Sequence, residues 1–232
     1  MIKEIFEVKN NNHISSGKFS ISSIGCCKRK KFMEIKKLWH EDYDAKTQLT
    51  FATGDAFHRL AVKTIMENGD KLNIRVCSAE VDIPEQRFFS GRADLIVSDG
   101  KEMMVTDVKS CSDYTLMMVD KGEVSQSYID QVNLYLHFFN LKTGYILFFG
   151  KHKAVVKEAK VVYDETRALE LIADVEDFMI NYVEKNICPD KCTEEISPWG
   201  CKCCETMMDD DFTAENIKER IENRVNKIME KL

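Results

Sequence analysis

The stretch from Ser90 to Asp113 contains two apolar runs separated by a tight-turn signal. The runs cover Leu95 to Val97 and Met103 to Val108, and both are rich in residues that favour β-strands. Ser98-Asp99-Gly100 lies between them, and glycine supplies the positive φ that such a turn needs. We therefore predict a β-hairpin here, and this hairpin determines where the charged residues of the stretch can lie.

Three charged side chains converge on the predicted hairpin. Asp94 would lie on its first strand, and Asp107 and Lys109 on its second. Because side chains alternate across a strand, Asp107 and Lys109 share one face while Val108 points the other way into the core. Two carboxylates this close repel each other unless a cation lies between them, and oxygen ligands suit Mg²⁺ or Mn²⁺.

A lysine beside two such carboxylates can stabilise charge that develops during phosphoryl transfer. The pattern therefore indicates nuclease-type chemistry, with Asp107 and Lys109 at a site that solvent reaches. The structural alternative is a hairpin whose charges are simply solvated on its outer face.

Composition places the chain in a reducing compartment. With 232 residues, of which 44% are hydrophobic, it can bury one substantial core and a small appendage. We see neither an apolar run of membrane-spanning length nor the apolar core of a signal peptide. Nine cysteines in such a chain favour metal or cluster ligation over disulfides. We expect a soluble protein of the cytoplasm, or of the host cytoplasm if the chain is phage-encoded, with no membrane partner.

Only one segment is strongly basic. The net charge of -6 predicts no general attraction to nucleic acid, so DNA binding must depend on local patches. Serines at 20, 22 and 23 precede an apolar-periodic stretch, which predicts a helix whose other face carries basic residues between Lys28 and Lys37. Charge alone leaves open whether this face is merely solvated or contacts phosphates.

Two other predicted helices carry polar candidates. The first runs from Gly54 to Met66, with His58 at the border of its apolar stripe. That stripe comprises Phe57, Leu60, Ala61, Thr64 and Ile65. The second helix runs from Ser125 to Asn140, and its Gln131 and Tyr135 are four residues apart and share a face. Structural roles at the core edge are the alternative for all three polar residues.

The remaining elements complete the fold class. Strands are predicted from Arg75 to Ile83, Thr143 to Gly150 and Ala154 to Tyr163, and a helix from Glu165 to Lys185. The order of helix, strands, helix, strands and helix predicts an α/β fold with a mixed central β-sheet flanked by helices.

The tail of the chain has a different composition. Five cysteines fall between Cys188 and Cys204, and Cys201 and Cys204 have the C-x₂-C spacing with which two thiolates chelate one centre. An acidic run then leads to a charged amphipathic helix from Thr213 to Leu232, which would dock on the body or on a partner subunit.

Together these motifs resemble the PD-(D/E)XK nuclease superfamily. In order they are Cys27-x-Arg29, Gly54-x₃-His58, Gly91-x₂-Asp94, Asp107-Val108-Lys109, Gln131-x₃-Tyr135 and the C-terminal cysteines. More narrowly, the chain resembles the RecB-like exonuclease branch, which includes the CRISPR-associated iron–sulfur exonucleases and similar phage proteins. The match spans Ser20 to Cys204.

The resemblance implies a restriction-endonuclease-like core at residues 50–185 of a single nuclease domain spanning 1–232. The basic helical segment would cover 20–40, the cysteine cluster segment 186–206 and the C-terminal helix 212–232. By resemblance, a divalent metal, Mn²⁺ or Mg²⁺, would be ligated by His58, Asp94, Asp107 and the backbone carbonyl of Val108. Lys109 would orient or activate the attacking water, and Gln131 and Tyr135 would position the lysine and the DNA strand.

The resemblance also implies a [4Fe–4S] cluster that joins one N-terminal cysteine to three C-terminal ones. Cys27 fits the first place because Arg29 follows it at the family's distance, where Cys26 would be one residue off. Family members commonly have a third cysteine after the C-x₂-C pair, and this chain has none after Cys204. The third ligand would then come from upstream, and we choose Cys192 over Cys188 because it is closer to the pair.

A Zn²⁺ ion is the competing occupant of this segment. Tetrahedral thiolate sites accept the spacing of Cys188, Cys192, Cys201 and Cys204.

The expected function is that of a metal-dependent DNA exonuclease acting on single-stranded DNA or DNA ends, in CRISPR adaptation, recombination or repair. Its partners would be DNA and a protein of a recombination or CRISPR adaptation complex. One alternative is a non-catalytic or partner-dependent DNA-binding subunit of a larger nuclease complex. Another is a restriction-type endonuclease, disfavoured by His58 and the Gln131/Tyr135 pair, which belong to the exonuclease branch.

Overall fold

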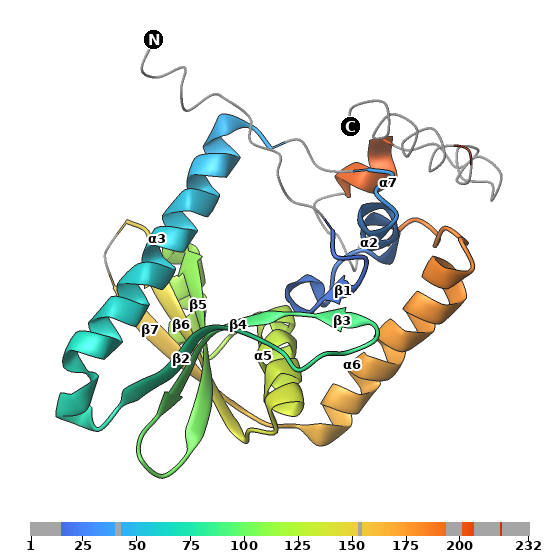
Figure 1. Cartoon of the computed structure of the whole chain (residues 1–232). Coiled ribbons are helices and arrows are strands. Elements are labelled where there is room, and N and C mark those ends of the chain that lie inside the picture. The colour runs from blue at the N-terminus through green and yellow to red at the C-terminus, as the bar shows by residue number, and fades with distance from the viewer. Residues whose placement is uncertain (1–14, 40–42, 153–154, 194–200, 207–218, 220–232) are drawn as a thin grey trace, which may run out of the picture. The chain divides into compact units, whose positions relative to one another are not determined.

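The computed structural model describes residues 15–39, 43–152, 155–193, 201–206 and 219, and the chain divides into two compact units (Figure 1). Among the described residues, the first unit comprises those within 43–86 and 90–171. The second unit comprises the described residues within 12–42, 87–89 and 172–232. No helix in these described segments is long and apolar enough to cross a membrane. The predicted C-terminal helix from Thr213 to Leu232 lies outside the described residues, apart from residue 219.

A mixed five-stranded sheet forms the centre of the first unit. The strand order is β2-β4-β5-β6-β7; β5 and β6 pair in parallel, and all other neighbours are antiparallel. The strands are β2 (Arg75–Asp82), β4 (Arg92–Ser98), β5 (Met103–Cys111), β6 (Thr143–Gly150) and β7 (Val156–Val162). The predicted α/β class with a mixed sheet is confirmed.

The predicted hairpin is formed by β4 and β5, with Ser98 paired to Met103 next to the turn. Gly100 has φ +83°, as expected for a residue chosen for its backbone freedom. The Asp99 carboxylate accepts hydrogen bonds from the backbone N–H groups of Lys101 and Glu102, both at 2.9 Å. These contacts close the turn with local interactions, which is why its sequence was sufficient to predict it.

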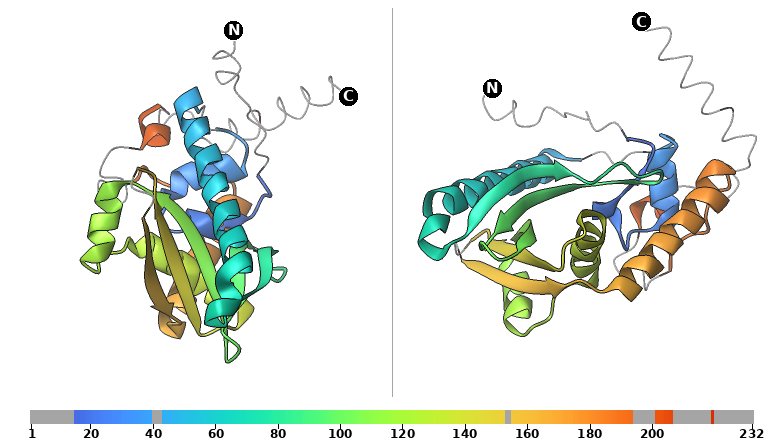
Figure 2. Two further views of the ribbon diagram at one scale, coloured as in Figure 1. Left: turned by 90° about the vertical axis from the view of Figure 1, so that its left-hand side faces the viewer. Right: turned by 60° about the horizontal axis from the view of Figure 1, so that its bottom comes forward.

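Two helices cover opposite faces of this sheet (Figures 1 and 2). They are α3 (Ala45–Asn68) and α5 (Gln126–Phe139). On β6, Phe149 contacts Phe57 of α3, with ring centroids 5.6 Å apart, while the neighbouring Phe148 contacts Tyr128 of α5 at 6.2 Å. Because successive side chains of a strand point to opposite faces, the two contacts place α3 and α5 on the two sides of the sheet.

The predicted helix over 54–66 is longer in the structure and faces the sheet differently. It begins at Ala45 because the Asp44 side chain accepts a hydrogen bond from Thr47 N at 2.8 Å and so caps the helix. Leu60, predicted on the apolar stripe, is 48% exposed. The contact with the sheet is made instead by Ala61, with Val62 and Ile65. These residues pack against a core cluster on β4 and β5 comprising Leu95, Val97, Met104 and Val108.

Helix α4 (Asp113–Asp120) was not predicted. It follows β5 directly, and Ser112 caps it by accepting a hydrogen bond from Thr115 N at 3.2 Å. The helix predicted from Glu165 to Lys185 is α6 (Glu165–Phe178), which continues as the π-helical turn η3 (Met179–Glu184).

The second unit has its own aromatic core. Phe19 packs edge-to-face on Phe178 and on Phe89, with ring centroids 6.0 and 6.4 Å apart. The unit also contains β1 (Phe19–Ser20), the 3₁₀ turn η1 (Ile21–Ser23), α2 (Lys28–Ile35) and α7 (Lys202–Thr206). The backbone N–H of Phe19 donates to the carbonyl of Phe88 at 2.7 Å, where β1 pairs with β3 (Phe89–Ser90).

The predicted basic helix exists, but two of its cations are buried. Cys27, and not one of the serines, is the N-cap of α2, and its sulfur accepts a hydrogen bond from Lys30 N. Arg29 is 4% exposed and Lys31 8% exposed. Lys31 Nζ donates to Ser23 Oγ at 3.0 Å and to the Glu34 carboxylate at 3.3 Å, so its charge is compensated within the protein. Arg29 and Lys31 are therefore not part of an exposed basic face on this helix.

Gly144 on β6 allows α5 to approach the sheet. A Cβ added to it would lie 2.6 Å from Val132 Cγ1 and 3.2 Å from the carbonyl oxygen of Val105. We predict that Gly144→Ala lowers the free energy of unfolding by about 1–3 kcal/mol, because the helix must shift. Chemical denaturation of purified protein measures this difference.

Gly54 provides the matched control, since its added Cβ would meet only Ser110 Oγ at an ordinary 3.5 Å. It lies inside α3, where alanine is favoured over glycine by up to about 1 kcal/mol. Gly54→Ala should therefore leave stability unchanged or raise it. Equal destabilisation by both substitutions would contradict the close packing of α5 on β6.

Candidate active site and cysteine site

The two predicted carboxylates meet where β4 and β5 stop pairing. The last paired residues of this ladder are Leu95 and Thr106, and one step further in the same register Asp94 stands opposite Asp107. Opposed residues of antiparallel strands project from the same face. Beyond this point the Asp94 Oδ2 atom accepts a hydrogen bond from the Val108 backbone N–H at 2.7 Å. The Asp94 side chain thus accepts the hydrogen bond that a backbone carbonyl of β4 would otherwise accept. This bond holds Asp94 beside Asp107.

His58 reaches the same place from α3. Its Nδ1 lies 3.3 Å from Asp94 Oδ1, so the two oxygens of Asp94 have different partners. The hydrogen bond to Asp94 raises the pKa of His58, while partial burial of the imidazole acts in the opposite direction. His58 therefore belongs to the charged constellation and is not a core-edge residue isolated from it.

Lys109, Asp107 and Gln131 form a closed triangle. Lys109 Nζ lies 2.9 Å from Asp107 Oδ2 and donates to Gln131 Oε1 at 3.1 Å. Gln131 Nε2 in turn donates to Asp107 Oδ1 at 2.9 Å. The oxygen of the Gln131 amide thus binds Lys109 and its nitrogen binds Asp107. Together these two hydrogen bonds fix the orientation of the lysine relative to the carboxylate.

Asp107 is 2% exposed, so the expectation that it lies at a solvent-reached position is wrong. Burial raises the pKa of this carboxyl, and the charge of Asp94 raises it further, whereas the Lys109 ammonium opposes both effects. A buried carboxylate of this kind requires a nearby cation to stay ionised.

Tyr135 acts on the backbone of β4. It is buried, and its hydroxyl donates to the carbonyl oxygen of Arg92 at 2.9 Å. Burial also raises the pKa of Tyr135, so the phenol stays protonated and can donate this bond. The contact secures the strand just before Asp94.

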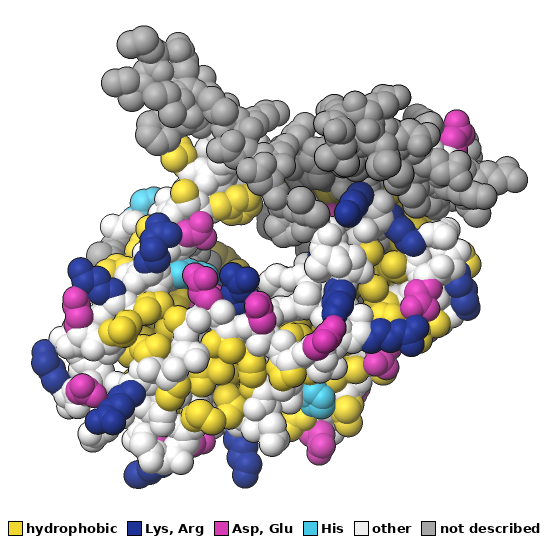
Figure 3. All heavy atoms as spheres, in the orientation of Figure 1, with side chains coloured by type: hydrophobic (Ala, Val, Ile, Leu, Met, Phe, Trp, Pro, Cys, Tyr) yellow, Lys and Arg dark blue, Asp and Glu magenta, His cyan; other side chains and the backbone are white. Residues whose placement is uncertain are grey.

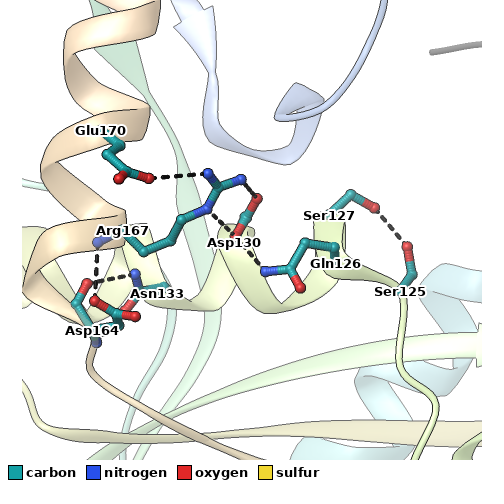
Figure 4. A network of polar contacts seen from close by, with 8 residues as sticks. All are labelled: Ser125, Gln126, Ser127, Asp130, Asn133, Asp164, Arg167 and Glu170. Atoms are coloured by element: carbon teal, nitrogen blue, oxygen red, sulfur yellow. Dashed lines mark hydrogen bonds and ion pairs between the residues drawn. The ribbon is translucent and has the colours of Figure 1, made fainter. Parts of the chain in front are cut away.

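A polar network fixes α5, the helix that carries Gln131 and Tyr135 (Figure 4). Asp130 accepts hydrogen bonds from Gln126 Nε2 at 2.8 Å and from Arg167 Nη2 at 2.7 Å. Asn133 exchanges two hydrogen bonds with the backbone of Asp164, both at 2.9 Å. Because Arg167 and Asp164 belong to the segment that begins α6, their bonds to Asp130 and Asn133 hold the rotation of α5 about its axis.

The donor set suits a divalent cation. Asp107 Oδ2 is buried and accepts no hydrogen bond, although Lys109 Nζ is close enough for an ion pair. Carboxylate oxygens with one imidazole match the ligand preferences of Mg²⁺ and Mn²⁺. Within the described residues, the ligand atoms that converge as a group that could hold a metal ion are those of four cysteines, and His58, Asp94 and Asp107 do not form such a group. Val108 contributes its N–H to Asp94, and its carbonyl as a ligand stays a prediction.

A groove of about 850 Å³ leads away from these residues between α3 and the sheet. His58, Asp94 and Val108 line it together with apolar side chains, among them Val62 and Met66 of α3. Figure 3 shows basic and acidic side chains interspersed with exposed hydrophobic ones along α3. The volume lies within the range of pockets that bind small ligands.

The second unit contains the cysteine site. The sulfur atoms of Cys27, Cys192, Cys201 and Cys204 all lie within 4.8 Å of one another. Cys204 Sγ is 3.6 Å from Cys27 Sγ and 3.7 Å from Cys192 Sγ. These are the four cysteines that the sequence predicts as one set, and they bring N- and C-terminal parts of the chain together.

The other cysteines of these segments are not members of this group. Cys26 Sγ contacts the carbonyl of Cys27, and Cys188 Sγ contacts that of Pro189. The zinc site predicted as the alternative includes Cys188 in place of Cys27. The sulfur atoms that lie together are those of the set with Cys27. Burial raises the pKa of the Cys192 and Cys204 thiols. Ionised sulfurs this close repel each other unless a cation neutralises them, so the site can hold a metal ion or an iron–sulfur cluster.

We predict that Cys27→Ser and Cys192→Ser each lose most of the metal bound to the purified protein. Serine keeps the N-cap that Cys27 provides to α2, so the loss would report on ligation. Metal content by mass spectrometry and visible absorption of anaerobically purified protein measure the effect. Cys26→Ser and Cys188→Ser serve as controls that retain the metal, and equal loss in all four variants would contradict the assignment.

We also predict that Asp94→Asn lowers the pKa of His58 in chelator-treated protein. The Asp94 carboxylate stabilises the protonated imidazole, so removing its charge leaves burial as the dominant effect. An NMR titration of His58 measures the shift. Asp99→Asn, in the hairpin turn, is the control that leaves the pKa of His58 unchanged. An unchanged pKa of His58 in Asp94→Asn would contradict the interaction between Asp94 and His58.

Comparison with known proteins supports the fold. No protein-family model matches the sequence, and no curated protein is similar to it. Among solved structures, the alkaline exonuclease LHK-Exo from Laribacter hongkongensis, in a complex with dAMP, aligns with a TM-score of 0.57 and 17% identity. The alignment covers 74% of this chain and 90% of that one. A phage-related exonuclease from Haemophilus somnus aligns with a TM-score of 0.51 and 14% identity, covering 72% of this chain and 94% of that one.

This chain thus shares its fold with solved exonucleases, in agreement with the resemblance of its motifs to the RecB-like exonuclease branch.

Proposed function

We propose that this chain is a divalent-metal-dependent DNA exonuclease that hydrolyses phosphodiester bonds of single-stranded DNA or DNA ends. The observation that carries the proposal is the Asp107–Lys109–Gln131 triangle beside Asp94 and His58, on an exonuclease fold. Fold alone is compatible with many activities, whereas this constellation has the residue types that phosphodiester hydrolysis needs.

His58, Asp94, Asp107 and the carbonyl of Val108 would hold Mn²⁺ or Mg²⁺. Such a cation lowers the pKa of a bound water and neutralises charge on the phosphate. Lys109 would donate hydrogen bonds to the attacking water or to the phosphate, because its ammonium has three N–H groups and the triangle directs them. Gln131 keeps Lys109 in place, and Tyr135 keeps Asp94 in place through the backbone of β4.

The groove beside α3 supports a single strand as the bound form. Its apolar residues would accommodate sugars and bases, and Arg59 and Lys63 offer partners for phosphates. Carboxylates also line it, and Lys63 Nζ lies 3.8 Å from Glu67, so a phosphate would have to displace that partner. The structure of LHK-Exo with dAMP concerns a protein of the same fold, and supports a nucleotide as the ligand class.

At the cysteine site we propose a [4Fe–4S] cluster bound by Cys27, Cys192, Cys201 and Cys204, with Zn²⁺ as the alternative. Either would stabilise the second unit by cross-linking segments far apart in sequence. Roles in CRISPR adaptation, recombination or repair, a protein partner in such a complex, a cytoplasmic location and one nuclease domain spanning the chain are proposals that rest on the sequence.

We predict that Asp107→Asn and Lys109→Ala each reduce cleavage at least about 100-fold, the effect of removing one group that stabilises transition-state charge. Because Asp107 is buried, asparagine is chosen to keep its shape and its bond from Gln131. The assay is shortening of end-labelled single- and double-stranded DNA with Mn²⁺ or Mg²⁺, using anaerobically purified protein.

Lys101→Ala, in the exposed hairpin turn, is the control that keeps full activity. Retained cleavage by Lys109→Ala would falsify the site assignment. If the protein without substitutions binds DNA ends but does not shorten them, a DNA-binding subunit is favoured instead. Defined internal cuts in circular DNA would favour an endonuclease.

A further inference from the structure

Lys109 has a third neighbour that no motif includes. Its Nζ lies 5.1 Å from the ring centroid of Tyr128, within the range of a cation–π contact. Tyr128 is on α5, three residues before Gln131, and residues at this spacing share one helix face. The ring therefore approaches Lys109 from the same helix that supplies the amide of the triangle.

The three contacts surround the ammonium group. Asp107 Oδ2 lies at 2.9 Å and Gln131 Oε1 at 3.1 Å, and the Tyr128 ring adds an uncharged face. The Lys109 side chain is 21% exposed. Partial desolvation strengthens the attraction between a cation and an aromatic ring.

Tyr128 is itself held in place. Its ring contacts Phe148 of β6, whose centroid is 6.2 Å away, and Phe148 is buried in the sheet. Lysine has a long side chain with many rotamers, so a fixed ring reduces the number of positions that the ammonium can adopt. An aromatic face is also a weaker partner for an N–H group than a phosphate oxygen, so it does not compete with substrate.

We propose that Tyr128 is a positioning residue for Lys109: its ring face holds the ammonium group in the Asp107–Gln131 frame. The predicted effect on cleavage rests on the proposed nuclease function. The effect on Lys109 itself does not, and this difference allows the two to be tested separately.

The test uses the full-length protein with Tyr128→Phe, which keeps the ring, and Tyr128→Leu, which removes it. Tyr114→Leu is the control, since Tyr114 is 66% exposed on α4. We expect Tyr128→Leu to lower kcat about tenfold with little change in KM, and Tyr128→Phe to stay within about twofold of the unchanged protein. Loss of activity in both variants to the same extent would overturn the proposal, because the ring would then not be the important group.

A second measurement does not need nuclease activity. The rate at which an acylating reagent modifies Lys109 in chelator-treated protein is followed by mass spectrometry of its peptide. We expect faster modification in Tyr128→Leu and an unchanged rate in Tyr128→Phe and Tyr114→Leu. Equal rates in all of them would overturn the proposal. Faster modification in a protein that never cleaves DNA would support the positioning role and overturn the proposed function.

If Tyr128→Leu does not fold, fluorinated phenylalanines at position 128 keep the shape of the ring while weakening its negative face. Under the proposal, kcat falls and Lys109 modification speeds up stepwise with the number of fluorines. A flat response across this series would show that the ring contributes only packing.

Discussion

The hydrogen bond from Val108 N–H to Asp94 is the contact on which the site depends. Regular pairing of β4 and β5 ends at Leu95 and Thr106, and a backbone donor beyond that point needs another acceptor. The Asp94 carboxylate provides it at 2.7 Å. The same bond therefore ends the ladder and fixes one acidic group beside the next strand, while Val108 itself packs into the core.

The position of Asp94 determines the electrostatics of the site. Asp107 is buried next to Asp94, and two adjacent carboxylates are stable as anions only if cations surround them. Lys109 supplies positive charge from β5, and His58 of α3 supplies it when its imidazole is protonated. The chain shares its fold with the exonucleases found by comparison. The chemistry must be argued from the charges themselves.

The local parts of this arrangement could be predicted from the sequence. Turn chemistry at Asp99-Gly100, strand alternation around Asp107 and the four-residue spacing of Gln131 and Tyr135 all depend on near neighbours. What could not be predicted depends on packing between distant segments. Lys31 is buried with Ser23, Glu34 and the Phe19 ring around its amine, and a run of basic residues in the sequence does not indicate this. Tyr128 was missed although its spacing from Gln131 was visible, because an aromatic residue on a helix usually indicates core.

Helix α5 explains why remote residues matter to the site. Positions 128, 131 and 135 lie on one face and contact, respectively, Lys109, the Asp107–Lys109 pair and the backbone of β4. A small rotation of the helix would move all of these groups together. Asp130 and Asn133 point elsewhere and are bound to the start of α6, so they oppose that rotation (Figure 4). The polar network of Asp130 and Asn133 is thus required for the position of Lys109, although neither residue contacts Lys109.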